Sequence, residues 1–240
     1  MIISDELSID STITYSSENQ NDSPFLFDTE EITYTSNVEE LEPQINNIVS
    51  SVNLGSNINL KNIALKIKNA EYNSNKFSKI ILKSKDKNIT ATIFPNGKMI
   101  CSGSKTEKES KLACKKFAKI VNKVDGKEDK IDLKSFKIQN IVVSYDVKFK
   151  ICLSKLYNEI SNLINNSKNL GNNNNYVKFN NDIVQSLIFY LNEPKISLSI
   201  FESGKIVLSG AKKRKEFEEI FRNIYPLIIE SKKISNEKKE

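Results

Sequence analysis

Histidine is absent from this chain of 240 residues. Its absence excludes catalytic triads built on His, His proton shuttles and most zinc sites. The three cysteines, Cys101, Cys114 and Cys152, are odd in number and lack the spacing of metal ligands. We expect them to be reduced core thiols of an intracellular protein. The sequence also has no phosphate-binding glycine loop, so we predict no enzyme activity, no cofactor and no metal site.

Long apolar segments are missing as well. No apolar run is long enough to cross a bilayer, and no basic start is followed by an apolar block. We therefore expect neither a membrane span nor a secretory signal, and no membrane partner. The hydrophobic fraction of 38% is sufficient for one or two small cores.

Basic residues are missing from the start of the chain, where the first Lys or Arg is Lys61 and eleven acids lie between Asp5 and Glu42. The whole chain carries a net charge of +6, so residues 61–240 hold 36 basic and 19 acidic residues (30 − 11), a net +17. A basic body with an acidic tail favours a nucleic-acid partner, and a merely solvated surface is the alternative. The polar, acidic composition of residues 1–42 predicts a disordered tail.

An internal repeat organises the rest of the chain. Residues 93–105 read IFPNGKMICSGSK and residues 200–212 read IFESGKIVLSGAK, and they align without a gap so that Phe94 matches Phe201. Each copy predicts a β-hairpin around a Gly-containing turn. Because strand side chains alternate between faces, Met99, Cys101, Ile206 and Leu208 should face a core. The opposite face carries branched aliphatics, small hydroxyls and one Lys in each copy.

The hydrophobic patterns predict the same order of elements twice. In the first copy we expect strands at 45–54, 77–83 and 89–94 and helices at 60–70 and 107–124, capped by Asn59 and by Thr106 or Ser104. In the second we expect strands at 136–147, 187–190 and 196–201 and helices at 153–164 and 213–229. The stripe 113, 117, 120 and 124 should be the buried face of the 107–124 helix. An Asn-rich surface insertion is expected at about 162–175.

Several segments resemble the TATA-box-binding protein family, in order and in both halves, over residues 44–233. They are NIVSSVNLG (47–55), LKNIALKIKNAEYN (60–73), IFPNGKMICSGSK, KIQNIVVSYDVKF (137–149), SGKIVLSGAK (203–212) and NIYPLI (223–228). The resemblance implies an α+β fold of two pseudo-symmetric repeats, 43–134 and 135–233, followed by a short C-terminal tail at 234–240. The repeats should form one curved antiparallel sheet, a saddle with its helices on the convex face. The concave face of this family widens and kinks the DNA minor groove.

The residues on the predicted non-core face suit the minor groove of A·T-rich DNA. That groove offers only acceptors on A·T pairs, so a reader needs amide donors, hydroxyls and apolar surface without carboxylates. The residues that we expect to contact bases are Asn47, Val49, Ile100, Ser102, Asn140, Val142, Val207 and Ser209. By resemblance, the Asn and hydroxyl residues lie near the dyad, and Ser102 and Ser209 stand where the family commonly has Thr.

The resemblance also assigns wedges and phosphate contacts. Phe77 and Phe94 should insert between base pairs at one end of the DNA site. Phe201 should do so at the other end, with Val184 in place of a fourth Phe. The expected phosphate contacts are Lys76, Lys83, Lys98, Lys195 and Lys205. Tyr190 stands where a basic residue is usual.

Protein partners are implied in the same way. Asp182 and Ile183 fall in the segment that contacts transcription factor IIB, and Lys111, Lys115 and Lys119 form a stripe that would meet other initiation factors. We therefore expect a general transcription initiation factor that binds and bends A·T-rich, TATA-type promoter DNA and nucleates a preinitiation complex. Its partners would be double-stranded promoter DNA, IIA- and IIB-like proteins and the RNA polymerase machinery. Its site of action would be the nucleus, or the site of viral transcription for a viral protein, and the free chain could form a homodimer. The alternative is a protein-interaction scaffold of the same fold with weak or no DNA bending.

Overall fold

The computed structural model describes residues 41–55, 58–68, 70–72, 78–85, 88–126, 135–168, 174–180 and 185–233. Within these residues, ten strands form one curved antiparallel sheet and four helices complete an α+β fold. Both halves have the same element order, as the repeat predicted. No helix in the described part of the chain is long and apolar enough to cross a membrane.

The first half contains β1 (Gln44–Asn53), α2 (Leu60–Lys66), β2 (Ala70–Tyr72), β3 (Ile80–Lys83), β4 (Thr90–Ile93), β5 (Lys98–Ser104) and α3 (Glu107–Asp125). The second half contains β6 (Lys137–Asp146), α4 (Leu153–Lys168), β7 (Tyr176–Asn180), β8 (Ser186–Leu191), β9 (Ile196–Phe201), β10 (Lys205–Ala211) and α5 (Arg214–Glu230).

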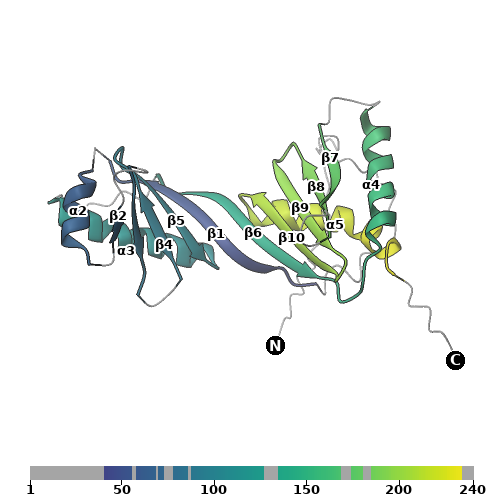
Figure 1. Cartoon of the computed structure of the whole chain (residues 1–240), viewed down its shortest axis with the longest axis horizontal. Coiled ribbons are helices and arrows are strands. Elements are labelled where there is room, and N and C mark those ends of the chain that lie inside the picture. The colour runs from purple at the N-terminus through teal and green to yellow at the C-terminus, as the bar shows by residue number, and fades with distance from the viewer. Residues whose placement is uncertain are drawn as a thin grey trace, which may run out of the picture.

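The two halves meet along β1 and β6, which pair antiparallel in the middle of the sheet. The strand order is β2-β3-β4-β5-β1-β6-β10-β9-β8-β7, so β2 and β7 are the outer edges. Figure 1 shows β1 and β6 as long twisted strands through the centre, with α2 and α3 at one end of the molecule and α4 and α5 at the other. The repeat therefore generates one continuous sheet.

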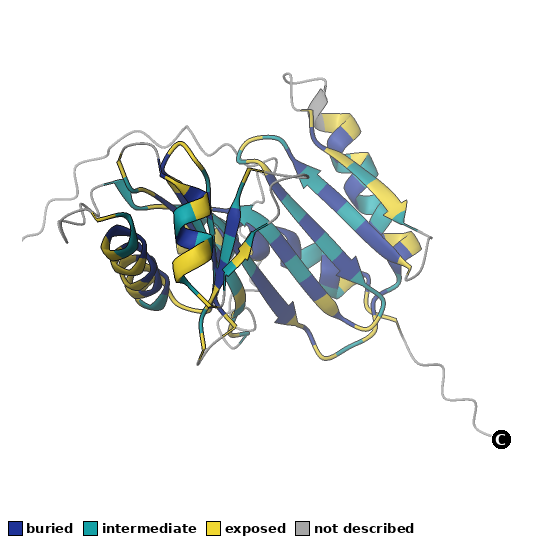
Figure 2. Cartoon of the chain, turned by 60° about the vertical axis from the view of Figure 1, so that its left-hand side comes forward, coloured by how far each residue is buried: buried dark blue, intermediate teal, exposed yellow. Residues whose placement is uncertain are grey.

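Burial alternates along the strands, as Figure 2 shows by dark blue and teal bands on the same arrow. In β5 and β10 the side chains of Met99, Cys101, Ile206 and Leu208 are fully buried, which confirms the predicted core face. Two buried clusters form, one under each pair of helices. Ser50 ties β1 to α3 in the first cluster, because its Oγ lies 2.7 Å from Ser110 Oγ. We call the other side of the sheet, away from these cores, the open face.

Several boundaries differ from the sequence predictions. The helix predicted at 60–70 ends at Lys66, because Ile67 is extended, and residues 70–72 form β2. The predictions missed β2 and β7, since short edge strands bury too little to show a clear alternation. The Asn-rich segment is partly regular, because 162–168 belong to α4. Residues 169–173 of that segment lie outside the described part.

Two predictions about buried residues also need correction. In α3, Ala113 and Phe117 are buried but Ile120 is 43% exposed, and the core side of this helix includes Cys114 and Val121 instead. Cys101 and Cys114 are buried free thiols, as expected, whereas Cys152 is only partly buried. The helix caps fit the sequence, since Thr106 Oγ1 accepts a hydrogen bond from Glu109 N at 3.1 Å.

Candidate nucleic-acid interface

Two asparagines at the centre of the open face are held by the neighbouring strands. Asn47 Oδ1 accepts a hydrogen bond from Gly103 N, and Asn140 Oδ1 accepts one from Gly210 N, both at 2.7 Å. A backbone N–H can only donate, so the oxygen of each amide is fixed toward the strand. The NH2 group of each amide then provides N–H donors, which are the groups that the acceptors of an A·T minor groove require.

The glycines that hold these amides cannot be replaced without a shift of the backbone. Gly103 and Gly210 have φ of +104° and +117°, where residues with a side chain are strained. A Cβ on Gly210 would lie 2.2 Å from Lys195 O, and one on Gly103 would lie 2.0 Å from Asn88 O. Each glycine lies at a register shift, Gly103 in the pairing of β5 with β1 and Gly210 in that of β10 with β6, as expected of a β-bulge. The Ser-Gly pair of each repeat motif therefore positions one asparagine.

Hydroxyls lie beside the asparagines. Asn140 Nδ2 donates to Ser209 Oγ at 3.3 Å, and Ser102 Oγ lies 3.0 Å from Thr90 Oγ1 on the paired strand β4. Ser102 and Ser209 are half-buried, in agreement with the alternation predicted for their strands. Both hydroxyls are therefore at hydrogen-bonding distance from groups that also face the open side.

The apolar residues predicted to contact bases occupy the same face. All four are half-buried and alternate with core residues; they are Val49, Val142, Ile100 and Val207. Cross-strand pairing places Val49 opposite Asn140, and Val142 opposite both Asn47 and Ser209. The sheet thus brings together all eight residues that were predicted as base contacts, although they are spread over residues 47–209 of the chain.

Sequence reasoning missed further residues of the open face. In the first half they are Ser51, Ile81, Thr90 and Thr92, and in the second Ser144, Ile188, Ser197 and Ser199. Asn46 Nδ2 donates to Ser144 Oγ at 3.0 Å, and Gln139 Nε2 donates to Ser51 Oγ at 2.7 Å. The two pairs lie on opposite sides of the pseudo-two-fold axis that relates β1 to β6. The gap-free alignment of the two hairpins, extended toward the N-terminus, would have found Thr90 with Ser197 and Thr92 with Ser199.

Two of the four predicted wedges can be placed. Phe201 ends β9 and Phe94 directly follows β4; both are half-buried, and neither contributes to the buried clusters. An aromatic ring left out of both cores has surface available for another partner. Phe77 and Val184 lie outside the described residues, as do Lys76, Asp182 and Ile183.

The remaining predicted phosphate contacts are exposed at strand ends. They are Lys83, Lys98, Lys195 and Lys205. Two acids close to this rim pair with lysines: Glu71 with Lys83 at 2.6 Å and Asp146 with Lys148 at 2.7 Å. The hydrogen bonds from Lys148 lower the pKa of Asp146, so this carboxylate stays ionised and paired at neutral pH. The interior of the open face carries no carboxylate among its described residues.

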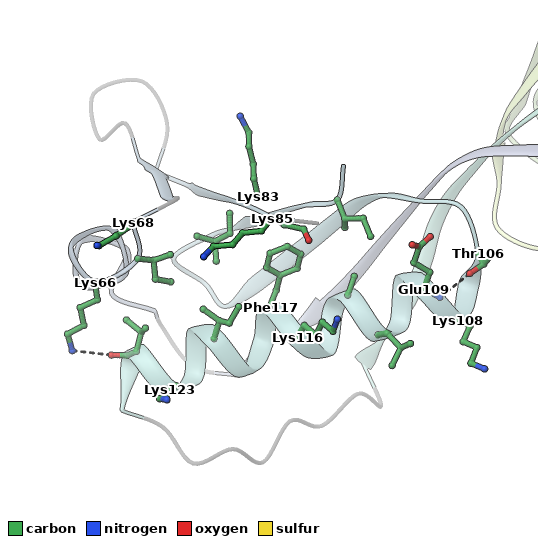
Figure 3. Close-up of a pocket in the computed structure, with 18 residues that line it drawn as sticks. Lys66, Lys68, Lys83, Lys85, Thr106, Lys108, Glu109, Lys116, Phe117 and Lys123 are labelled. Carbon is green, nitrogen blue, oxygen red and sulfur yellow. Dashed lines mark hydrogen bonds between the residues drawn. The ribbon is translucent and has the colours of Figure 1, made fainter. Parts of the chain in front are cut away.

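The helical side of the first repeat offers a second surface. Lys111, Lys115 and Lys119 are exposed along α3, as predicted. Beside them, a groove of about 860 Å³ runs between α2, α3 and the β3–β4 region. Figure 3 shows Phe117 pointing into this groove and lysines around its rim, including Lys68, Lys108, Lys116 and Lys123. The groove was missed, although the i,i+4 spacing of Leu112, Lys116 and Ile120 on an exposed stripe could have indicated it.

Comparisons with known proteins agree with this architecture. The sequence model of the family described as transcription factor TFIID (or TATA-binding protein, TBP) matches residues 42–124 and 135–231. The chain is 41% identical to the TATA-box-binding protein of Acanthamoeba castellanii over 85% of this chain and 72% of that protein. It is 42% identical to the TATA-box-binding protein of Dictyostelium discoideum over 80% of this chain and 86% of that protein. The solved structure of the Methanococcus jannaschii TBP superposes with a TM-score of 0.64 at 27% identity, covering 79% of this chain and 99% of that one.

Proposed function

The chain belongs to the TATA-binding protein family, and from this membership we propose that it binds TATA-type, A·T-rich promoter DNA through its open face as a general transcription initiation factor. Such a factor is a non-enzymatic DNA-binding protein. The observation that carries the proposal is the matched pair of asparagine amides, Asn47 and Asn140, whose oxygens are fixed by Gly103 and Gly210 at 2.7 Å. Their donors and the adjacent hydroxyls complement the acceptors of A·T pairs.

The flanking residues complete the proposed contact. Phe94 and Phe201, together with Phe77 and Val184, insert between base steps at the two ends of the site and bend the duplex. Unstacking costs a few kcal/mol per step and is offset by the surface gained when bent DNA wraps the protein. The phosphate contacts come from Lys76, Lys83, Lys98, Lys195 and Lys205. The scaffold alternative is not favoured, because the relatives are named for binding a TATA box.

Protein partners would bind the rest of the surface. We assign Lys111, Lys115 and Lys119, with the neighbouring groove, to an acidic, amphipathic segment of a IIA-like factor. The groove has an apolar floor, and even without Lys83, which faces the DNA side, its lining holds six lysines against one glutamate. Asp182 and Ile183 would contact a IIB-like factor, and the assembly would recruit the polymerase machinery. The protein would act in the nucleus, or at the site of viral transcription, and a homodimer would be a state of the free chain.

The experiment is a binding titration of the full chain against an A·T-rich duplex and a scrambled duplex, over a range of salt concentrations. If five to eight lysines contact phosphates, the logarithm of the association constant should fall linearly with the logarithm of the salt concentration, with a slope of about −5 to −7. The A·T-rich duplex should bind more tightly and show bending by fluorescence transfer between its ends. Equal, weak binding of both duplexes with no bending would contradict the proposed function.

A further inference from the structure

The outer edges of the open face differ between the two repeats, although their strands are equivalent. The alignment that matches Phe94 with Phe201 also matches Lys83 in β3 with Tyr190 in β8, and Glu71 in β2 with Lys178 in β7. The registers agree, because Glu71 pairs with Ile81 and Lys178 with Ile188, which is the equivalent residue. The lysine of the second repeat, Lys178, therefore lies on the edge strand, one strand further out than Lys83 in the first repeat.

The first repeat neutralises its edge cation. Lys83 Nζ lies 2.6 Å from Glu71 Oε1, and both side chains are more than half exposed. Figure 3 shows Lys83 pointing away from α3, toward the open face. A phosphate that approaches Lys83 must therefore compete with Glu71, since these two side chains together carry no net charge.

In the second repeat the edge cation lies over an aromatic ring, whereas in the first it pairs with a carboxylate. Lys178 Nζ lies 5.4 Å from the centroid of the Tyr190 ring, within the range of a cation–π contact. Tyr190 is itself stacked on Tyr176, with ring centroids 4.5 Å apart. Phe179, the next residue, contacts Tyr157 of α4, which shows that Lys178 lies on the opposite side of β7 from the helices. Neither β7 nor β8 contains an acid.

We propose that Lys178 supplies the DNA phosphate contact at the outer edge of the second repeat, positioned by the ring of Tyr190. The ring brings the ammonium group back over β8, to the place in the sheet that Lys83 occupies in the first repeat. It leaves the three N–H donors of the lysine available, because a π face is not a hydrogen-bond acceptor of the strength of a carboxylate. The edge of the second repeat therefore attracts phosphate more strongly than that of the first. This inference rests on the proposed DNA binding by the open face.

The test compares full-length variants in salt titrations on the A·T-rich duplex. Lys178→Gln should reduce the magnitude of the salt slope by about 1 and weaken binding roughly eightfold at 0.1 M salt, the loss of one phosphate contact. Lys178→Gln/Tyr190→Lys, which places a lysine at the position equivalent to Lys83 of the first repeat, should recover the slope. Lys61→Gln on the exposed side of α2 is the matched control and should change neither quantity.

The outcomes separate the two proposals. If Lys178→Gln keeps the wild-type slope, or loses no more than Lys61→Gln, the role of Lys178 is wrong while the proposed function stands. If Lys178→Gln weakens binding but the double variant fails to recover it, the place assigned to the cation over β8 is wrong. If the wild-type chain itself does not prefer the A·T-rich duplex, the proposed function fails and this inference with it.

Discussion

The replacement of Asn140 by Asp tests the interface most directly, because it changes a single non-hydrogen atom of the site. In the wild-type chain the side-chain oxygen accepts from Gly210 N at 2.7 Å, and the nitrogen donates to Ser209 Oγ at 3.3 Å. An Asp carboxylate keeps the first contact with added charge, and its second oxygen can accept from the Ser209 hydroxyl. The fold should therefore be retained, with a thermal midpoint close to that of the wild type.

DNA binding should respond differently. Asn140→Asp removes both N–H donors and places a carboxylate against the N3 and O2 acceptors of A·T pairs. The lost base contact alone is worth about 1–3 kcal/mol, and repulsion adds to it. Since about 1.4 kcal/mol corresponds to a tenfold change, the dissociation constant should rise at least about 5- to 150-fold. Asn47→Asp should act in the same way, because the geometry at Gly103 is the same.

The assay is fluorescence anisotropy on a labelled A·T-rich duplex at fixed salt, with thermal unfolding measured in parallel. Asn165→Asp on the exposed side of α4 adds the same charge away from the open face and should change the dissociation constant less than twofold. If Asn140→Asp binds as tightly as Asn165→Asp while both remain folded, the amide does not face the bases and our assignment of the interface is wrong.

Three further changes have expected outcomes. Gly210→Ala should lower the thermal midpoint, because its Cβ would lie 2.2 Å from Lys195 O at a φ of +117°, and a strained backbone of this kind costs about 1–3 kcal/mol; an unchanged midpoint would contradict the tight bulge. Deletion of residues 1–42, which hold eleven acids, should raise the association rate with DNA at low salt in stopped-flow mixing, and identical rates would show that this segment does not compete for the open face. Val184→Phe should slow dissociation from DNA, because stacking of an aromatic ring on a base is worth about 1–3 kcal/mol. It should also weaken the preference for an easily unstacked TA or CA step at the end bound by the second repeat. Unchanged dissociation, alongside loss of binding by Phe77→Ala, would exclude a wedge at residue 184.

The sequence by itself determined the repeat, the order of most elements and the face of each central strand. These follow from local information: strand alternation separates Met99 and Cys101 from Ile100 and Ser102, whatever the rest of the chain does. The alignment of the two hairpin motifs carries the same assignment to the second half. Short edge strands were missed because β2 is three residues long and shows no period that could be read locally.

Only the tertiary structure decided which atoms meet. The orientation of the Asn140 amide depends on a backbone N–H from Gly210, 70 residues away, and the position of Lys178 depends on the ring of Tyr190 in the next strand. The pairing of Glu71 with Lys83 likewise appears only once β2 and β3 are in register. These contacts arise from cross-strand geometry, which joins residues that are distant in the chain. A local sequence pattern therefore predicts the residue types at the site. It does not predict which hydrogen-bond donor each residue presents to a ligand, or which charges are paired within the protein.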